Sequence, residues 1–161
     1  MSSLFPALSS AASAAVAAST AFVDARIRQT VEQVLMGSPV ARALGIRLDV
    51  LAVDQVELLL PFSAANVTVG DVVHGGVIAT LIDVAGAAAA ASGADAGNLR
   101  GGATSSLNIQ FLEAARAVSL RAVANVVRRG RRQVVSEVSV YAEGTDEAGL
   151  VAKALMSSTL F

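Results

Sequence analysis

Asp83 is the only charged residue in residues 74–93, a run of otherwise apolar and small side chains with the spacing of a long helix. An ionised carboxylate that leaves water without a partner loses several kcal/mol, and no Lys or Arg lies within two helical turns of this one. An isolated acid in such a segment indicates chemistry. The alternative is an interfacial acid that is satisfied by Thr80 and by the backbone of a partner chain.

Backbone N–H groups at the start of this helix provide the second component of a candidate site. Gly75 and Gly76 occupy the first turn, where unpaired donors and the positive end of the helix dipole favour an oxyanion. Thr80 lies one turn before Asp83 on the same face, so we expect its hydroxyl to hydrogen-bond the acid. Gly76 and Thr80 are predicted to contact the substrate. Alternatively, the two glycines serve only close packing.

The spacing of these groups predicts a site that is shared between two chains. Eight residues separate Gly75 from Asp83, which corresponds to about 12 Å along a regular helix. An oxyanion donor and a base must both lie about 3 Å from the reacting group or its water. Two helices packed antiparallel across a two-fold axis would bring Asp83 of one chain to Gly75 of the other.

Composition excludes several other classes of site. A net charge of −1 gives no basic surface for nucleic acid or an anionic membrane, so neither is expected as a partner. The chain contains no cysteine and one histidine, which excludes thiolate nucleophiles and multi-histidine metal sites within one chain. No serine-hydrolase elbow, phosphate-binding loop or dinucleotide fingerprint is present either. We therefore expect neither a metal nor a cofactor. The absence of cysteine also leads us to expect a cytoplasmic location.

The elements that must position these residues follow an α+β order. An Ala/Ser-rich extension, residues 1–23, precedes a single domain at residues 24–161. Periodicity and turn residues predict short helices at 24–35 and 38–45, strands at 46–53 and 55–62, a turn segment at 63–73, the long helix, and strands at 103–113, 118–127, 133–143 and 149–161. A helix that is apolar on every side must be wrapped by its surroundings. We therefore predict an antiparallel sheet of about six strands curled around it.

The sequence also resembles a known family. HGGVIATLID at residues 74–83, followed by Gly86, is similar to the helix start of hotdog-fold acyl-CoA thioesterases of the phenylacetic acid degradation type, in which an acid lies nine residues after the histidine. ATSSLNIQFL at residues 103–112 resembles the next strand of that family, and the later Arg-Gly-Arg-Arg hairpin is similar too. The resemblance covers residues 38–161 and implies the hotdog fold.

The resemblance implies a role for each matching residue. Asp83 would be the nucleophile or the general base for water, and the Gly75 N–H would polarise the thioester carbonyl. Asn66 resembles an asparagine that positions the thioester or the water, and Thr104 lies where a hydroxyl orients the nucleophilic water. His74 would fix the entry to the helix more than it would move protons.

Four arginines, at positions 128, 129, 131 and 132, form the one charge cluster of the sequence and lie in a predicted hairpin. They are interpreted either as a solvated basic turn or as a contact to the phosphates of coenzyme A. In the second case Arg128, Arg129 and Arg131 bind substrate.

The function predicted from these observations is hydrolysis of an acyl-CoA or aryl-CoA thioester by a homodimer with shared sites, which pairs further into a homotetramer. Two alternatives remain. One is a non-catalytic acyl-CoA-binding hotdog protein, against which the acid at position 83 argues. The other is an enoyl-thioester hydratase or dehydratase, which would need a histidine paired with an acid.

Overall fold

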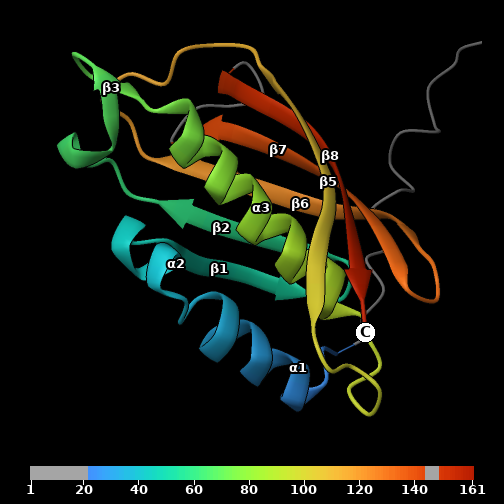
Figure 1. Cartoon of the computed structure of the whole chain (residues 1–161). Helices are drawn as coiled ribbons and strands as arrows, with labels where there is room; N and C mark the ends of the chain where they lie inside the picture. Colours follow the sequence, from blue (N-terminus) through green and yellow to red (C-terminus); the bar gives the residue numbers. More distant parts are fainter. Residues whose placement is uncertain (1–21, 144–148) are drawn as a thin grey trace, which may run out of the picture.

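The computed structural model describes residues 22–143 and 149–161, in which a six-stranded sheet curves around one long helix (Figure 1). This arrangement confirms the predicted α+β architecture. The predicted N-terminal extension, residues 1–23, lies almost entirely outside the described residues, as does the predicted turn at residues 144–148.

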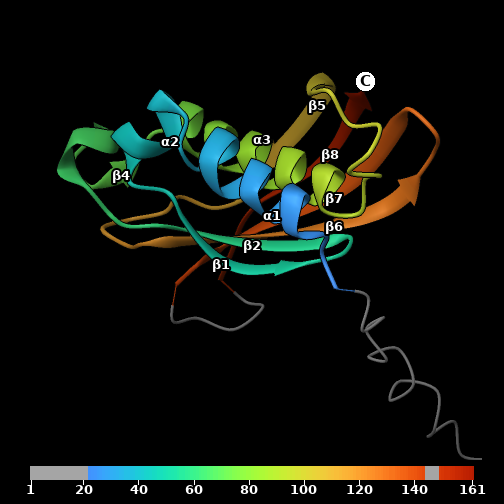
Figure 2. The same ribbon diagram turned by 90° about the horizontal axis from the view of Figure 1, so that it is seen from below.

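The main sheet is antiparallel throughout and has the strand order β1-β2-β6-β7-β8-β5. Its strands are β1 Arg47–Ala52, β2 Gln55–Leu60, β5 Gly102–Phe111, β6 Leu120–Arg129, β7 Gln133–Ala142 and β8 Leu150–Leu160. Seen from below, the labelled helices α1, α2 and α3 lie on one side of the sheet (Figure 2). All six strands correspond to predicted ones, so the sheet was predicted correctly.

The central helix α3 spans Gly75–Ser92 and forms the core together with the inner face of the sheet. Leu81, Ile82 and Ala88 have no exposed surface. Gly86 allows the closest approach to the sheet, because a Cβ at this position would lie 2.5 Å from the Met156 sulfur. The helix is long and apolar enough to cross a membrane, but it is mostly buried inside the fold, as expected for a core helix.

Short helices pack against α3 on the same side of the sheet (Figure 2). They are α1 Ala25–Thr30, a π-helical turn Val31–Leu35, and α2 Pro39–Leu44. The second half of the first predicted helix, Val31–Leu35, thus has the wider turns of a π-helix in place of α-helical ones. The spacing of apolar residues does not encode this difference. The second helix follows the prediction, because Ser38 caps its start and Gly45 ends it with a φ of 70°.

Two hairpins precede α3. The predicted hairpin between β1 and β2 is confirmed, and Asp54 takes its positive φ of 66° at the turn. A second, very short hairpin of β3 Val67–Val69 and β4 Val72–Val73 lies within the segment that was predicted as a turn. Five residues of strand are too few to produce a readable alternation.

The strand β5 lies at one edge of the sheet and is the most exposed of the six. Its neighbour within the chain is β8, and no described strand pairs with its other side. Residues Gly102 to Ser106 are all exposed. An edge of this length with free backbone groups is suited to pairing with another strand.

Candidate active site

The carboxylate of Asp83 is held by a hydroxyl from the edge strand. Thr104 Oγ1 donates a hydrogen bond of 2.6 Å to Asp83 Oδ1. In β5 the pairing with β8 shifts register between Thr104 and Ser106, which marks a β-bulge. The extra residue lets both Thr104 and Leu107 face α3 despite their odd spacing. The resemblance implied that the Thr104 hydroxyl orients the nucleophilic water, and in the structure this hydroxyl bonds the acid itself.

Thr80 does not contact the acid, contrary to the expectation from its helical spacing. Its hydroxyl donates a 2.9 Å bond to the Gly76 carbonyl, one turn back along α3. A threonine within a helix readily bonds the carbonyl four residues before it, and this local bond occupies the donor. The partner of Asp83 therefore comes from another element.

Asp83 opens onto a cavity of about 590 Å³, so the carboxylate is only partly buried and is not cut off from water in this chain. The cavity lies along the face of α3, between the first helical segment and β5. Its wall includes Thr30, Val34, Leu35, Ala87, Ala91, Leu99, Arg100, Thr104, Ser158 and Leu160. Apart from a few polar groups, the residues beside the acid are small or apolar.

The N-terminus of α3 presents one free backbone donor. His74 Nδ1 accepts a 2.8 Å hydrogen bond from the Gly76 N–H, and the His74 carbonyl accepts from Val77 and Ile78. The Gly75 N–H has no hydrogen-bond partner among the described residues. His74 thus acts as the helix cap, which agrees with its predicted structural role, and it leaves Gly75 available.

Asn66 lies at the same end of α3. Its backbone carbonyl accepts a 2.8 Å bond from the His74 N–H, which ties the end of the short 3-10 helix Ala64–Asn66 to the entry of α3. A cavity of about 380 Å³ adjoins this end, and Gly75, Ile78 and Phe111 line part of it. The Gly75 N–H and the backbone of Asn66 therefore lie together at this end of α3, which is called the amide end.

Within one chain the acid and the amide end remain apart. α3 is continuous from Gly75 to Ser92, so the two groups are separated by about 12 Å along its axis. The structure thus confirms the regular helix on which the prediction of a shared site depends. The structure brings Asp83 and Thr104 together at one place along α3, and Gly75 and the Asn66 backbone together at another.

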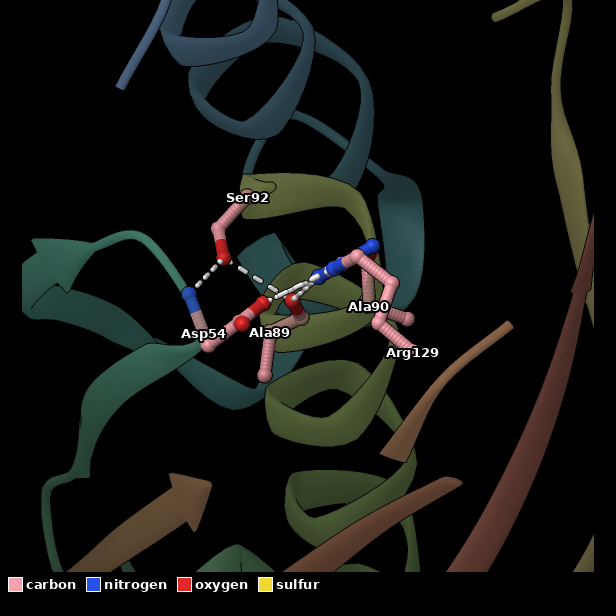
Figure 3. A network of polar contacts seen from close by, with 5 residues as sticks. All are labelled: Asp54, Ala89, Ala90, Ser92 and Arg129. Carbon is pink, nitrogen blue, oxygen red and sulfur yellow. Dashed lines mark hydrogen bonds and ion pairs between the residues drawn. The ribbon is translucent and has the colours of Figure 1, made fainter. Parts of the chain in front are cut away.

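Arg129 has a different role from the one predicted for it. Its guanidinium reaches the C-terminal end of α3, where Nη1 donates to the Ala90 carbonyl at 2.7 Å and Nη2 to the Ala89 carbonyl at 3.2 Å (Figure 3). Nε and Nη2 also contact Asp54 Oδ1, at 2.9 and 2.5 Å. Ser92 Oγ completes the network by accepting from the Asp54 N–H. This arginine therefore anchors the helix.

The remaining arginines lie on the outer part of the β6–β7 hairpin and are exposed. Arg131 and Arg132, together with Arg129, line a cavity of about 620 Å³. Leu99 and Leu160 border both this cavity and the one at Asp83, so the two are neighbours. Arg128 does not line it and faces a separate cavity of about 360 Å³ on the same hairpin.

Comparisons with known proteins agree with this geometry. A model of the thioesterase superfamily matches residues 70–148. A thioesterase family protein from Silicibacter pomeroyi has a similar structure, with a TM-score of 0.76, 26% identity, and coverage of 84% of this chain and 98% of that one. The matched family model and this structural neighbour support the hotdog thioesterase family for this chain.

Two other known proteins are similar to this chain. The PaaI protein of the Escherichia coli phenylacetic acid degradation operon shares its fold, with a TM-score of 0.73, 22% identity, and coverage of 84% of this chain and 94% of that one. A candidate esterase of Saccharolobus solfataricus is 27% identical over 125 residues, which is 78% of this chain and 79% of its own length. The family supports thioester hydrolysis as the general activity.

Some residues that the structure places near the candidate site were not singled out from the sequence. Asp54 and Ser92 join the anchor of α3, and Ser158 enters the wall of the cavity at Asp83. Asp54 stood between two predicted strands, which marked it as a turn residue and gave no sign of its contact with the helix.

No group of three or more metal-ligating side chains occurs within residues 22–143 and 149–161.

Proposed function

We propose that this protein hydrolyses an acyl-CoA or aryl-CoA thioester to the free acid and CoA at a site shared by two subunits. Asp83 of one subunit acts as nucleophile or as general base, and the Gly75 N–H of the other polarises the carbonyl. One observation carries the proposal. The same helix bears an acid whose carboxylate is held by Thr104 and, about 12 Å away at its N-terminus, the Gly75 N–H without a hydrogen-bond partner among the described residues.

The two groups supply the chemistry of acyl transfer. The carbonyl carbon gains a bond to oxygen, either from water that loses a proton to Asp83 or from the Asp83 carboxylate itself. In the first route the C–S bond then breaks, and CoA leaves as a thiol with the proton that Asp83 took from the water. In the second route the C–S bond breaks as a mixed anhydride with Asp83 forms, and a water molecule then hydrolyses the anhydride, which releases the free acid, restores the carboxylate and supplies the proton of the thiol. Negative charge that builds up on the carbonyl oxygen is stabilised by the Gly75 N–H and by the positive end of the helix dipole. Thr104 fixes one carboxylate oxygen and leaves the other free.

The exposed edge of β5 supports a particular dimer. β5 runs alongside α3, so that the Phe111 ring lies beside Gly75, where an added Cβ would be 3.6 Å from it, while Thr104 contacts Asp83. If two β5 edges pair antiparallel about an axis between Leu107 and Asn108, Phe111 of one subunit faces Thr104 of the other. The amide end of each subunit then meets the acid of its partner, and the dimer completes two sites. A tetramer is not needed for this.

A thiol-release screen tests the activity. The protein is incubated with a panel of aliphatic and aromatic acyl-CoA esters, and free CoA is measured over time. We expect at least one ester to be turned over by the wild type, and the Asp83→Asn variant to lose at least about a hundredfold in kcat, because both proposed roles require the carboxylate. Equal rates in wild type and a correctly folded Asp83→Asn protein would exclude the assignment.

Subunit exchange tests the shared site. Gly75→Pro removes only the proposed donor, because proline is favoured at the first helical position and His74 already has the extended ψ of 133° that precedes a proline. Neither Asp83→Asn nor Gly75→Pro should be active alone. After random exchange, half of the dimers combine the two variants and each has one intact site, so about a quarter of wild-type activity should return.

The Gly75→Ala variant is the matched control. It keeps the N–H, and its Cβ would lie 3.6 Å from the Phe111 ring, an ordinary contact, so its activity should stay close to wild type. If the exchanged mixture of dimeric variants recovers no activity, the Asp83 carboxylate and the Gly75 N–H of one site do not come from different subunits.

A further inference from the structure

Two buried serine hydroxyls on the inner face of the sheet lack partners. Ser136 on β7 is 1% exposed and Ser158 on β8 is 4% exposed. Neither Oγ atom has a hydrogen-bond partner among the described residues. A buried hydroxyl without a partner destabilises a fold by about 1–3 kcal/mol, so its presence calls for a ligand, a water molecule or another explanation.

Of the two, Ser158 has the position of a ligand contact. It pairs directly with Thr104 across the β5–β8 ladder, and paired residues point to the same face of a sheet. Because Thr104 points toward Asp83, Ser158 lies on the same side, in the wall of the cavity. Rotation about its Cα–Cβ bond between staggered rotamers can turn Oγ toward the cavity.

The cavity leads from the acid, past Ser158, to the arginines. Leu160 follows two residues later on the inner face of β8 and borders both this cavity and the one that Arg131 lines. The route therefore offers a carboxylate, a hydroxyl, an apolar stretch and then positive charge. The thiol arm of CoA has a corresponding order, since its sulfur is followed by two methylene groups, an amide, further methylene groups and, at the far end, phosphates.

We propose that this cavity holds the thiol arm of CoA and that Ser158 hydrogen-bonds the amide nearest the sulfur. The inference deepens the proposed function and rests on it. Paired residues hold their Cβ atoms about 5 Å apart, a span comparable to two methylene groups between sulfur and amide. The acyl group then lies on the opposite side of the thioester carbon, beside Gly75 and Phe111 of the partner subunit, so that residues of this amide end select it.

Binding of two probes separates the arm from the phosphates. Dissociation constants of CoA and of pantetheine, which keeps the amides and lacks the phosphates, are measured by calorimetry or by competition. Ser158→Ala should weaken both probes by a similar factor of about three to ten, the value for one neutral hydrogen bond. Arg131→Ala should weaken CoA and leave pantetheine unchanged. Ser157→Ala, the neighbour on the outer face, is the control and should change neither.

The outcomes distinguish this inference from the proposed function. If the wild type releases no thiol from any ester but the two probes respond as stated, hydrolysis fails and the arm assignment stands. If esters are hydrolysed but Ser158→Ala binds pantetheine as the wild type does, or if pantetheine does not bind at all, the arm assignment is overturned. A melting temperature of Ser158→Ala at or above wild type shows that lost affinity does not come from unfolding.

Discussion

Replacement of Arg129 by methionine removes the anchor at the C-terminal end of α3 and keeps a long apolar stem. In the structure the Arg129 side chain is 23% exposed and donates to the carbonyls of Ala89 and Ala90 as well as to Asp54. The variant leaves two helix carbonyls and one carboxylate without this donor. Water can reach part of them, because the Asp54 side chain is 43% exposed.

The expected loss of stability follows from these contacts. The ion pair with a partly exposed carboxylate contributes at most about 1 kcal/mol. Two hydrogen bonds from a charged donor to helix carbonyls, with the favourable interaction with the helix dipole, add about 1–2 kcal/mol after partial replacement by water. Together we expect Arg129→Met to lower the free energy of unfolding by about 1–3 kcal/mol, which corresponds to about 2–12 °C in melting temperature for a chain of this size.

Urea and thermal unfolding of four variants, namely Arg129→Met, Arg128→Met, Asp54→Asn and the double variant, measure this effect. Arg128→Met is the matched control, because Arg128 is adjacent, exposed and outside the anchor, and it should change stability by less than about 0.5 kcal/mol. Asp54→Asn combined with Arg129→Met should cost less than the sum of the two single changes, since both remove the same ion pair. Equal stability of the Arg128 and Arg129 variants would refute the anchor.

Three further changes test other contacts. Thr104→Val removes the hydroxyl that holds the Asp83 carboxylate and should lower kcat about tenfold with little change in KM. An unchanged kcat would mean that this hydrogen bond does not orient the carboxylate for reaction. Arg131→Ala should raise KM for acyl-CoA several-fold more than KM for the same acyl group on N-acetylcysteamine, whereas equal effects on both would argue against a phosphate contact. Ser136→Ala removes a buried hydroxyl without a partner and should raise the melting temperature by about 2–4 °C, while a decrease would reveal a hidden partner such as water.

The parts of the fold that were predictable are those that local patterns encode. Alternation in β6 placed Leu120, Ala122 and Ala124 on the buried face, and the structure agrees. The apolar run from residue 74 to residue 93 became one regular helix, with Gly75 and Gly76 in its first turn and Asp83 about 12 Å further along its axis. Each of these features depends on neighbours within a few positions along the chain.

The parts that were not predictable depend on register between strands. Continued alternation in β6 would place Arg128 on the inner face, yet a bulge between Val126 and Arg128 brings Arg129 there instead. In the same way, the contact between Thr104 and Asp83 depends on how β5 lies beside α3. Spacing along the helix could not supply this relation, and the resemblance implied only that the Thr104 hydroxyl orients the nucleophilic water. Bulges are set by hydrogen bonding to another strand, and a single sequence shows little of that.

The two bulges, in β5 and β6, determine which single-residue deletions these strands can tolerate. At each bulge one strand has a residue more than its partner, so loss of Ser105 or Val127 would restore a regular ladder and leave every inward-facing side chain on its present face. Loss of any other single residue within these strands would turn one part of the strand over relative to the rest. Across variants that differ by deletions, β5 and β6 should therefore each tolerate shortening at one position.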